Sequence, residues 1–288
     1  MRNEYSFNLD TEPVIMGILN VTPDSFSDGG KYTEIDKALI QVEKMARDGA
    51  KIIDVGGEST RPGYEPISVQ EEIERVSPVI QAIKDRIPIP ISIDTYKPKV
   101  ARAAIDVGAD MVNDIWGLKG HKAMEFMDLK EPKSGIPFIK TMAKVVAESG
   151  VPVVISHNRL HAQYENFMED MLDDLRESID MAHQAGVKDG QIILDPGIGF
   201  AKTYNQNLYA INHVDQLRKM GYPVLLGVSR KSVLRKTLNT DSLDILGASV
   251  AGTVVGLERG CRMFRVHDVK ENYQAMMMAW KLMNSQRY

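Results

Sequence analysis

The amino-acid sequence predicts a single-domain α/β protein of the (β/α)8 TIM-barrel class. Eight short apolar runs each end on a polar residue, and each is followed by an amphipathic helical stretch. The first and last of these polar residues lie 247 positions apart, so the seven steps average about 35 residues, the length of a strand, a helix and two short loops. Eight such units need roughly 250 residues, which fits one domain over residues 1–288. The polar residues are Asn20, Asp54, Asp94, Asn113, His157, Asp195, Ser229 and His267.

The predicted strands are the apolar runs themselves. In a (β/α)8 barrel the catalytic groups lie at the C-terminal ends of the strands. The polar residues that follow the runs are therefore expected to converge on one pocket. The runs are residues 14–19, 51–53, 91–93, 111–112, 153–156, 192–194, 224–227 and 263–266.

Several predicted helices have their own start and stop signals. Ser68 with Glu71, and Asp268 with Glu271, have the spacing of a capping box. The stretch 165–186 places apolar side chains on one core-facing stripe. Glycines just before the next strand are expected in the left-handed conformation that ends a helix. These are Gly49, Gly108, Gly150, Gly186 and Gly221.

The regular spacing is broken between the third and fifth runs. Asp94 and Asn113 are only 19 residues apart, whereas Asn113 and His157 are 44 apart. The excess lies near residues 121–141, where Pro132 and Pro137 interrupt a helical pattern. We expect an insertion after strand four, on the side of the pocket. It is either a surface elaboration or a lid that narrows access to the pocket.

Composition excludes several classes of protein. A net charge of −4 gives no electrostatic reason to expect nucleic acid or an anionic membrane surface as a partner. The chain has no apolar run of 18 residues, and residues 1–5 do not resemble the core of a signal peptide. Cys261 is the only cysteine, which suits a reducing compartment. A cytoplasmic location is expected.

Three strand-end residues, Asp94, Asn113 and Asp195, could bind a neutral heterocycle. A carboxylate buried at the end of a barrel strand is costly unless it meets a donor. Asp can accept hydrogen bonds from an amino group and a ring N–H, and Asn can both donate and accept, so the three suit an amino-pyrimidinone edge. The alternative is that each residue caps the helix that follows it.

Basic residues near the end of the chain predict an anion site. Lys231 and Ser232 stand where a helix is expected to begin, and backbone N–H groups at a helix N-terminus favour anions. Arg265 and His267 are two residues apart on one strand and therefore share a face. With Arg61 they suggest a phosphate or carboxylate ligand.

Two long loops are expected beside the pocket. Residues 20–30 and 56–63 are rich in Gly, Ser, Thr and Pro, and both follow a predicted strand. Asn20, Asp24 and Asp28 offer oxygen ligands appropriate to Mg²⁺ beside a polyphosphate.

With these residues in view, the chain closely resembles the dihydropteroate synthases, the family of pterin-binding TIM barrels that join a pterin to p-aminobenzoate in folate biosynthesis. The resemblance covers nearly the whole chain in family order, and two of its motifs are long and rarely met elsewhere. The matching segments are residues 17–30, 56–63, 92–95, 113–115, 195–200, 229–232 and 265–267.

The resemblance implies a role for each candidate site residue. The implied catalytic residues are Asp94, Lys231, Asp28 and Arg61. The implied pterin ligands are Asp94, Asn113, Asp195, Lys231 and Arg265. The implied pyrophosphate ligands are Asn20, Arg61, Arg265 and His267, with Mg²⁺ held at Asn20. The implied p-aminobenzoate contacts are Phe26, Thr60, Pro62, Phe200, Lys231 and Ser232.

The resemblance also implies a dissociative reaction that releases pyrophosphate. It further implies that the protein is a homodimer and that sulfonamides inhibit it. Two features depart from the family pattern: Ser156 stands where the family usually has Met, and the insertion at 121–141 is long. Two alternatives are a barrel methyltransferase that passes a methyl group from methyl-tetrahydrofolate to a corrinoid, and a catalytically silent pterin-binding paralogue. The methyltransferase has no use for the Lys231–Ser232 anion site or the 59–63 loop. The silent paralogue predicts loss of residues from the two long loops, and none is lost.

Overall fold

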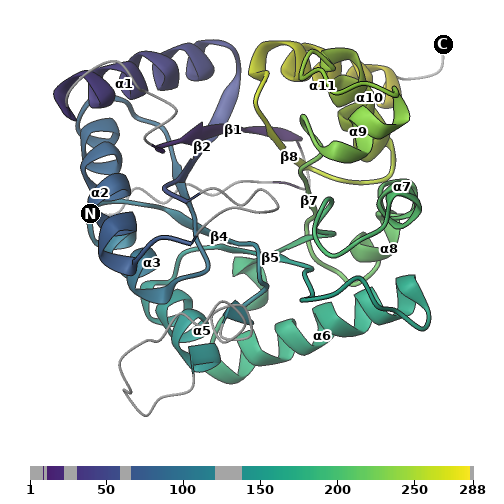
Figure 1. Ribbon diagram of the computed structural model, residues 1–288, viewed down its shortest axis with the longest axis horizontal. Helices are drawn as coiled ribbons and strands as arrows, with labels where there is room; N and C mark the ends of the chain where they lie inside the picture. Colours follow the sequence, from purple (N-terminus) through teal and green to yellow (C-terminus); the bar gives the residue numbers. More distant parts are fainter. Residues whose placement is uncertain (1–8, 10–11, 23–30, 59–65, 121–137, 286–288) are drawn as a thin grey trace.

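Eight parallel strands form the centre of the molecule (Figure 1). The computed structural model describes residues 9, 12–22, 31–58, 66–120 and 138–285. The strands are β1 (Val14–Asn20), β2 (Ala50–Gly56), β3 (Ile91–Asp94), β4 (Met111–Asp114), β5 (Val153–Ser156), β6 (Ile192–Asp195), β7 (Leu225–Leu226) and β8 (Met263–Val266).

The sheet closes into a barrel. The hydrogen-bonded order runs β6-β5-β4-β3-β2-β1-β8-β7. Its two edges are joined by a parallel bridge between Leu194 and Val224, and the backbone N–H of Leu194 donates to the carbonyl of Pro223 at 2.9 Å. The predicted (β/α)8 TIM-barrel class is confirmed.

The strand register aligns several of the predicted polar ends. Asn20 is paired with Gly56, Gly56 with Asp94, and Asp94 with Asn113. On the other side of the barrel Ser156 is paired with Asp195. The ends of neighbouring strands therefore lie at one level, as the spacing of the sequence predicts.

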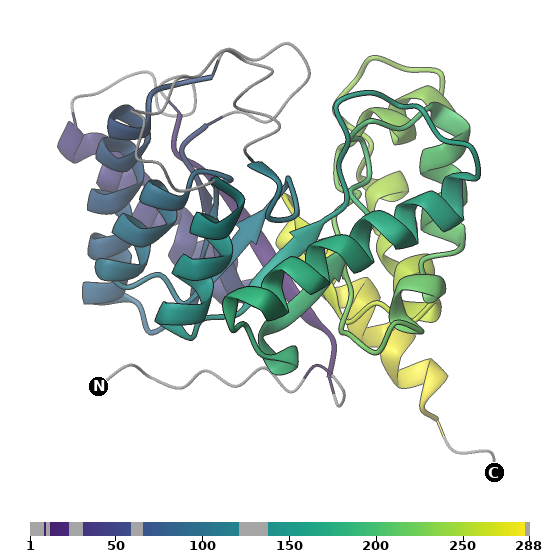
Figure 2. The same cartoon turned by 90° about the horizontal axis from the view of Figure 1, so that it is seen from below.

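Helices surround the barrel and bury its outer face (Figures 1 and 2). Outward side chains such as Ile53, Ile93 and Leu194 join one large apolar core with the helices. The helical elements are α1 (Lys31–Arg47), α2 (Val69–Arg86), α3 (Pro98–Asp106), α5 (Phe138–Ser149), α6 (Phe167–Ala185), η2 (Asp189–Gln191), α7 (Tyr204–Asn212), α8 (Asp215–Arg218), α9 (Ser232–Thr237), α10 (Leu246–Glu258) and α11 (Val269–Met283).

The predicted helix boundaries are mostly confirmed. The five glycines expected to end helices all have a positive φ, between 73° and 116°. The hydroxyl of Ser68 caps α2 by accepting from the backbone N–H of Glu71 at 3.1 Å. Asp268 stands at the N-cap position of α11, as predicted, but the predicted capping box does not form, because its side chain makes no cap bond. Both of its carboxylate oxygens instead accept from Arg230, at 2.6 and 3.1 Å.

The predicted insertion falls mainly outside the described residues. Residues 121–137 are not described, and α5 begins at Phe138, inside the predicted range. Within the described chain, no helix combines the length and the apolar character needed to cross a membrane.

Candidate active site

The interior of the barrel changes from apolar to polar toward the C-terminal ends of the strands. Side chains two residues apart on a strand face the same way, so the inner face of β2 carries Ile52, Asp54 and Gly56, and that of β6 carries Ile193 and Asp195. The apolar level comprises Leu9, Met16, Ile52, Met111, Val154, Ile193, Leu225 and Met263. Two residues further along the same strands, the polar level includes Asp54, Asn113, Ser156, Asp195 and Arg265.

Arg265 joins three strands at this polar level. Its Nε donates to Oδ2 of Asp54 at 2.6 Å, and its Nη2 donates to Oδ2 of Asp94 at 2.5 Å. Asn113 Nδ2 also donates to Oδ2 of Asp54, at 3.1 Å. Asp54 is fully buried and lies two residues before the end of β2. Sequence reasoning named it as a strand end but gave it no role at the site; its inward register with Ile52 was the available signal.

Several acceptor oxygens at this level are unused by the described part of the chain. Oδ1 of Asp54, Oδ1 of Asp94 and Oδ1 of Asn113 are buried, and none has a hydrogen-bond partner among the described residues. A buried polar atom without a partner costs about 1–3 kcal/mol. The three oxygens are therefore suited to a ligand that brings N–H donors.

Burial dominates the electrostatics of the charged groups. It raises the pKa of Asp94 to about 7, although the charges of Arg265 and Lys231 act to lower it. Burial likewise raises the pKa of Asp195, against a backbone hydrogen bond from Gly197. The pKa of Lys231 is lowered to about 8, first by burial and then by the charge of Arg265. Because the pKa values of Asp94 and Lys231 lie near 7 and 8, a bound ligand can change the protonation state of either group.

Asp195 and Lys231 lie on the opposite side of the barrel mouth from β2 and β3. Oδ1 of Asp195 accepts from the backbone N–H of Gly197 at 2.7 Å, and its Oδ2 accepts from the hydroxyl of Ser156 at 3.4 Å. The Nζ of Lys231 lies 4.4 Å from the centre of the Phe200 ring. Lys231 immediately precedes α9, and Ser232 is its first residue, as predicted.

His267 lies beside this group at the end of β8. Its Nδ1 is 3.1 Å from the hydroxyl of Ser229, which also accepts from the backbone N–H of His267 at 3.1 Å. Burial, followed by the charges of Arg265 and Arg230, lowers the pKa of His267 to about 3. The imidazole is therefore neutral at physiological pH, so that it offers a hydrogen bond rather than a charge.

The alternative that the strand-end residues cap the following helices is wrong for Asp94 and for Asp195, since the N-cap of α7 is Thr203 and Asp195 accepts from Gly197 in the preceding turn. Lys97 is the N-cap of α3, and the side chain of Asp94 binds Arg265 instead. After β4 the turn is capped by Asp114, which accepts from the backbone N–H groups of Trp116 and Leu118 at 2.8 and 3.0 Å. Asn113 faces inward, toward Asp54.

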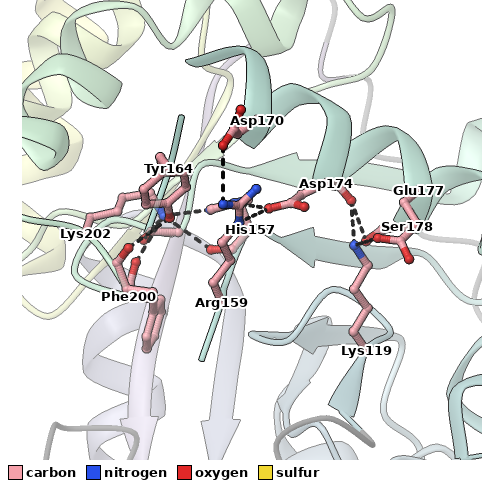
Figure 3. A network of polar contacts seen from close by, with 12 residues as sticks. Lys119, His157, Arg159, Tyr164, Asp170, Asp174, Glu177, Ser178, Phe200 and Lys202 are labelled. Atoms are coloured by element: carbon pink, nitrogen blue, oxygen red, sulfur yellow. Dashed lines mark hydrogen bonds and ion pairs between the residues drawn. The ribbon is translucent and has the colours of Figure 1, made fainter. Parts of the chain in front are cut away.

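A polar network at the ends of β5 and β6 adjoins the site, and sequence reasoning missed it (Figure 3). Lys202 Nζ donates to Nδ1 of His157 at 2.8 Å and to the carbonyls of Gly197 and Phe200 at 3.0 and 3.1 Å. The other ring nitrogen of His157 donates to Asp174 at 2.9 Å. Burial lowers the pKa of His157 to about 4 and that of Lys202 to about 7. No sequence spacing links Lys202 to His157, because the contact depends on how two loops fold over adjacent strands.

Some predicted site residues lie outside the described residues. These are Phe26, Asp28, Thr60, Arg61 and Pro62, together with Asp24. Asn20, the predicted Mg²⁺ ligand, is exposed at the end of β1. Among the described residues, no three or more His, Cys, Asp or Glu side chains lie close enough together to hold a metal ion. Of the residues predicted to offer oxygens to Mg²⁺, Asn20 is the one within the described chain, so an ion held there would need further oxygens from a substrate, water or other residues.

Comparisons with known proteins show which family the chain belongs to. The family model for pterin binding enzymes matches residues 16–267. The chain is 52% identical to the dihydropteroate synthase of Clostridium beijerinckii over 273 residues, 94% of this chain and 95% of that one. A Clostridium difficile dihydropteroate synthase solved with pteroic acid has a TM-score of 0.87 and 42% identity, covering 98% of this chain and 100% of that one. A Xanthomonas albilineans dihydropteroate synthase solved with 4-aminobenzoic acid has a TM-score of 0.85 and 35% identity, covering 96% and 95%.

The fold and site thus define a pterin-binding barrel enzyme. The chain belongs to the dihydropteroate synthase family. The predicted enzyme class, a transferase of folate biosynthesis, is confirmed. The corrinoid methyltransferase alternative loses its support, because identity to synthases extends over nearly the whole chain.

Proposed function

We propose that this chain condenses 6-hydroxymethyl-dihydropterin pyrophosphate with p-aminobenzoate to give dihydropteroate and pyrophosphate. One observation carries the assignment of this reaction to the barrel mouth. Three buried acceptor oxygens, on Asp54, Asp94 and Asn113, face a site in which basic groups lie alongside them. That combination suits a ring rich in N–H donors that carries an anionic leaving group.

The pterin is proposed to bind deepest, at the polar level of the barrel. Its amino group and ring N–H groups would donate to Asp94 and Asp195, and Asn113 can both donate and accept. Arg265 holds Asp94 by a charge-assisted hydrogen bond and so fixes its orientation. Sites of this kind reject analogues that lack the hydrogen-bonding groups by roughly 10⁴-fold or more.

The p-aminobenzoate is proposed to bind nearer the surface, against Phe200 and Lys231. The ring of Phe200 offers an apolar wall, and the ammonium group of Lys231 lies over it. The hydroxyl of Ser232, the first residue of α9, is proposed to donate to the carboxylate. The residues proposed to complete this subsite, Phe26, Thr60 and Pro62, lie outside the described residues.

The pyrophosphate is proposed to lie toward Asn20, Arg61, Arg265 and His267. Neutral His267 can donate one hydrogen bond to it, and the Arg265 guanidinium can supply positive charge once the substrate competes with Asp94 and Asp54 for its donors. Mg²⁺ held at Asn20 would supply further positive charge against the leaving anion.

A dissociative mechanism follows from the chemistry of the two substrates. The C–O bond to pyrophosphate breaks first, and its electron pair leaves with the pyrophosphate, since an arylamine is a weak nucleophile. The resulting methylene cation is conjugated with the pterin ring, and ionised Asp94 opposes its charge electrostatically. The lone pair on the amine nitrogen of p-aminobenzoate then forms the new C–N bond, and one N–H proton passes to the released pyrophosphate or to solvent. Asp28 and Arg61 are proposed to act from the two long loops, which would exclude water from the cation.

Pyrophosphate release tests the proposal. We expect release to require the pterin pyrophosphate, p-aminobenzoate and Mg²⁺ together, with dihydropteroate formed in equal amount. A silent pterin-binding paralogue would bind a pterin in calorimetry but release no pyrophosphate. Release that proceeds equally without p-aminobenzoate would contradict a synthase reaction.

We further propose that the chain is a cytoplasmic homodimer. Support for the dimer comes from α10 and α11, which pack against each other and leave large apolar side chains exposed. Helix α10 carries a single charged residue, Glu258, although such apolar helices are normally covered. The exposed side chains are Val255, Met278, Leu282 and Met283. The cytoplasmic location rests on the single cysteine, Cys261, which is buried.

A further inference from the structure

The turn that carries Phe200 is wrapped around the side chain of Lys202. The backbone N–H of Phe200 donates to the carbonyl of Gly197 at 3.1 Å, which closes the turn. Both carbonyls at the ends of this turn, those of Gly197 and Phe200, accept from Nζ of Lys202. A third short bond runs from the same ammonium group to Nδ1 of His157. One side chain therefore ties the turn after β6 to the end of β5.

His157 is itself held from helix α6. Only 2% of its surface is exposed, and its second ring nitrogen donates to Asp174. The same oxygen of Asp174 accepts from Nε of Arg159 at 2.5 Å. Figure 3 shows the resulting chain from α6 through His157 to Lys202 and the Phe200 turn. Because both ring nitrogens are engaged, the orientation of the imidazole is fixed.

The turn is pressed closely against these groups. Gly197 has a φ of +65°, and a Cβ atom at this position would lie 1.9 Å from the carbonyl oxygen of His157. On the other side, a Cβ atom at Gly199 would lie 3.3 Å from Cδ of Lys231. The turn that carries Phe200 is therefore packed between the backbone of His157 and the side chain of Lys231.

The backbone of Asp195 is anchored independently of Lys202, whereas its Oδ1 accepts from the backbone N–H of Gly197 in the turn. Its residue is paired with Ser156 in the ladder between β5 and β6, and its carbonyl accepts from the backbone N–H of His157 at 2.9 Å. The turn beyond it is closed by its own backbone bond and is held to β5 by the Lys202 side chain. A second anchor holds the outer part of the turn, where the backbone N–H of Gly199 donates to Asn207 at 2.6 Å.

We propose that Lys202, held by His157 and Asp174, is a positioning residue that sets the aminobenzoate subsite by fixing Phe200 against Lys231. The proposal rests on the proposed function, which assigns Phe200 to that subsite. It separates the two substrates, because the backbones of the proposed pterin ligands Asp94, Asn113 and Asp195 are held in the barrel sheet by strand pairing that does not involve Lys202.

Lys202→Met tests the role by removing the ammonium group with its three N–H donors while keeping an unbranched apolar side chain only one atom shorter. We expect the KM for p-aminobenzoate to rise about tenfold or more. The Kd for a pterin, measured by calorimetry without p-aminobenzoate, should stay within about twofold of the wild-type value. Lys219→Met is the matched control, because Lys219 lies on the surface in an i,i+4 pair with Asp215, and it should change neither constant.

Phe200→Ala, measured in the same assays, distinguishes failure of the positioning role of Lys202 from failure of the assignment of Phe200 to the aminobenzoate subsite. If Phe200→Ala raises the KM for p-aminobenzoate and Lys202→Met does not, the positioning role is overturned while the subsite assignment stands. If neither variant changes that KM, the assignment of Phe200 fails and takes the inference with it. If Lys202→Met raised the Kd for the pterin by the same factor as the KM for p-aminobenzoate, the inference would also be overturned, since Lys202 would then have a general structural role.

A second variant tests the same network in case Lys202→Met does not fold. Asp174→Ala acts at the partly exposed far end of the network, where 25% of the Asp174 side chain is accessible. It should raise the KM for p-aminobenzoate several-fold, again with pterin affinity kept. An unchanged KM would overturn the inference without any use of Lys202→Met.

Discussion

Arg265 and its two carboxylate partners, Asp54 and Asp94, form the hydrogen-bonded centre of the barrel mouth. The guanidinium group orients Asp94 and Asp54, and each of these retains one buried oxygen without a partner among the described residues. The sequence predicted Asp94, Asn113, Asp195 and Arg265 as neighbours, because strand ends of a parallel barrel must meet. It could not predict which of them pair with each other, since pairing depends on side-chain direction in the closed barrel.

Replacing Asp94 with Asn tests its electrostatic role. The substitution keeps the shape of the side chain and removes the charge that would oppose the pterin methylene cation. We expect kcat to fall by about 10²–10³-fold, the usual effect of losing one such stabilising group, while the circular dichroism spectrum stays unchanged. Near-normal turnover would show that the charge of Asp94 is not needed.

Buried His157 predicts a loss of stability in acid. Its pKa is lowered from 6.5 to about 4 in the folded state, so folding favours the neutral ring. This contribution is complete above pH 6.5 and is lost as the pH falls toward 4. Between pH 7.5 and 5 it amounts to roughly 2 kcal/mol.

The comparison of wild type with His157→Gln isolates this effect in urea unfolding. Raised pKa values at Asp94 and Asp114 act in the opposite direction over the same range, but they are common to both proteins. The wild type should lose about 2 kcal/mol more than the variant between pH 7.5 and 5. Equal pH dependence in the two proteins would show that His157 is not held neutral by the fold.

At the scale of helices and loops, local sequence signals predicted where most helices begin and end. The predictions failed where a side chain binds a residue far away in the sequence. Glycine predicted the ends of helices because few other residues tolerate a positive φ, and the hydroxyl of Ser68 predicted the start of α2. Asp268 failed as a cap because Arg230, 38 residues earlier, binds both of its oxygens. Lys202 and His157, 45 residues apart, were missed for the same reason.

Lys97 shows how such a long-range contact supports a loop. Its buried ammonium group pairs with Glu58 at 2.6 Å and Glu72 at 2.7 Å, and it donates to the carbonyl of Ile67 at 2.7 Å. Glu58 and Ile67 flank residues 59–65, which contain Thr60, Arg61 and Pro62. Lys97 therefore ties together the two ends of a loop that is proposed to contact both substrates.

Lys97→Met should destabilise the protein by about 3–5 kcal/mol, since it leaves two buried carboxylates without their cation. The free energy of unfolding in urea measures the effect. Burial raises the pKa of Glu72, so part of the loss should be recovered as the pH falls and the carboxyl is protonated. The control is Lys144→Met on the exposed surface of α5, where a change below about 0.5 kcal/mol is expected. Equal effects of the two substitutions would contradict the role of Lys97.

At the scale of the whole molecule, the repeat of about 35 residues was enough to predict the barrel. Each unit must bury a strand between its neighbours, and eight of them close the sheet. The bridge between Leu194 and Val224 that completes it joins two of the predicted runs, 192–194 and 224–227, although Val224 lies just before β7. The role of the segment around residues 121–141 stays a prediction.

The exposed apolar side chains on α10 and α11 predict a homodimer in solution. Light scattering after size exclusion should give twice the mass of the 32.2 kDa chain. Met278→Glu combined with Leu282→Glu should reduce it to one chain, because both side chains are about 60% exposed and a charge there would be desolvated in the interface. Ile40→Glu on α1, where the side chain is 65% exposed, is the control and should leave the mass unchanged. A wild-type protein of single mass would contradict the dimer.

The most direct test of the account is a crystal structure of this chain with a bound pterin. We predict that the ring lies in the mouth of the barrel and donates hydrogen bonds to Asp94 and Asp195, with Asn113 in contact with the same edge. A pterin bound elsewhere, with these three side chains unchanged in their contacts, would contradict it.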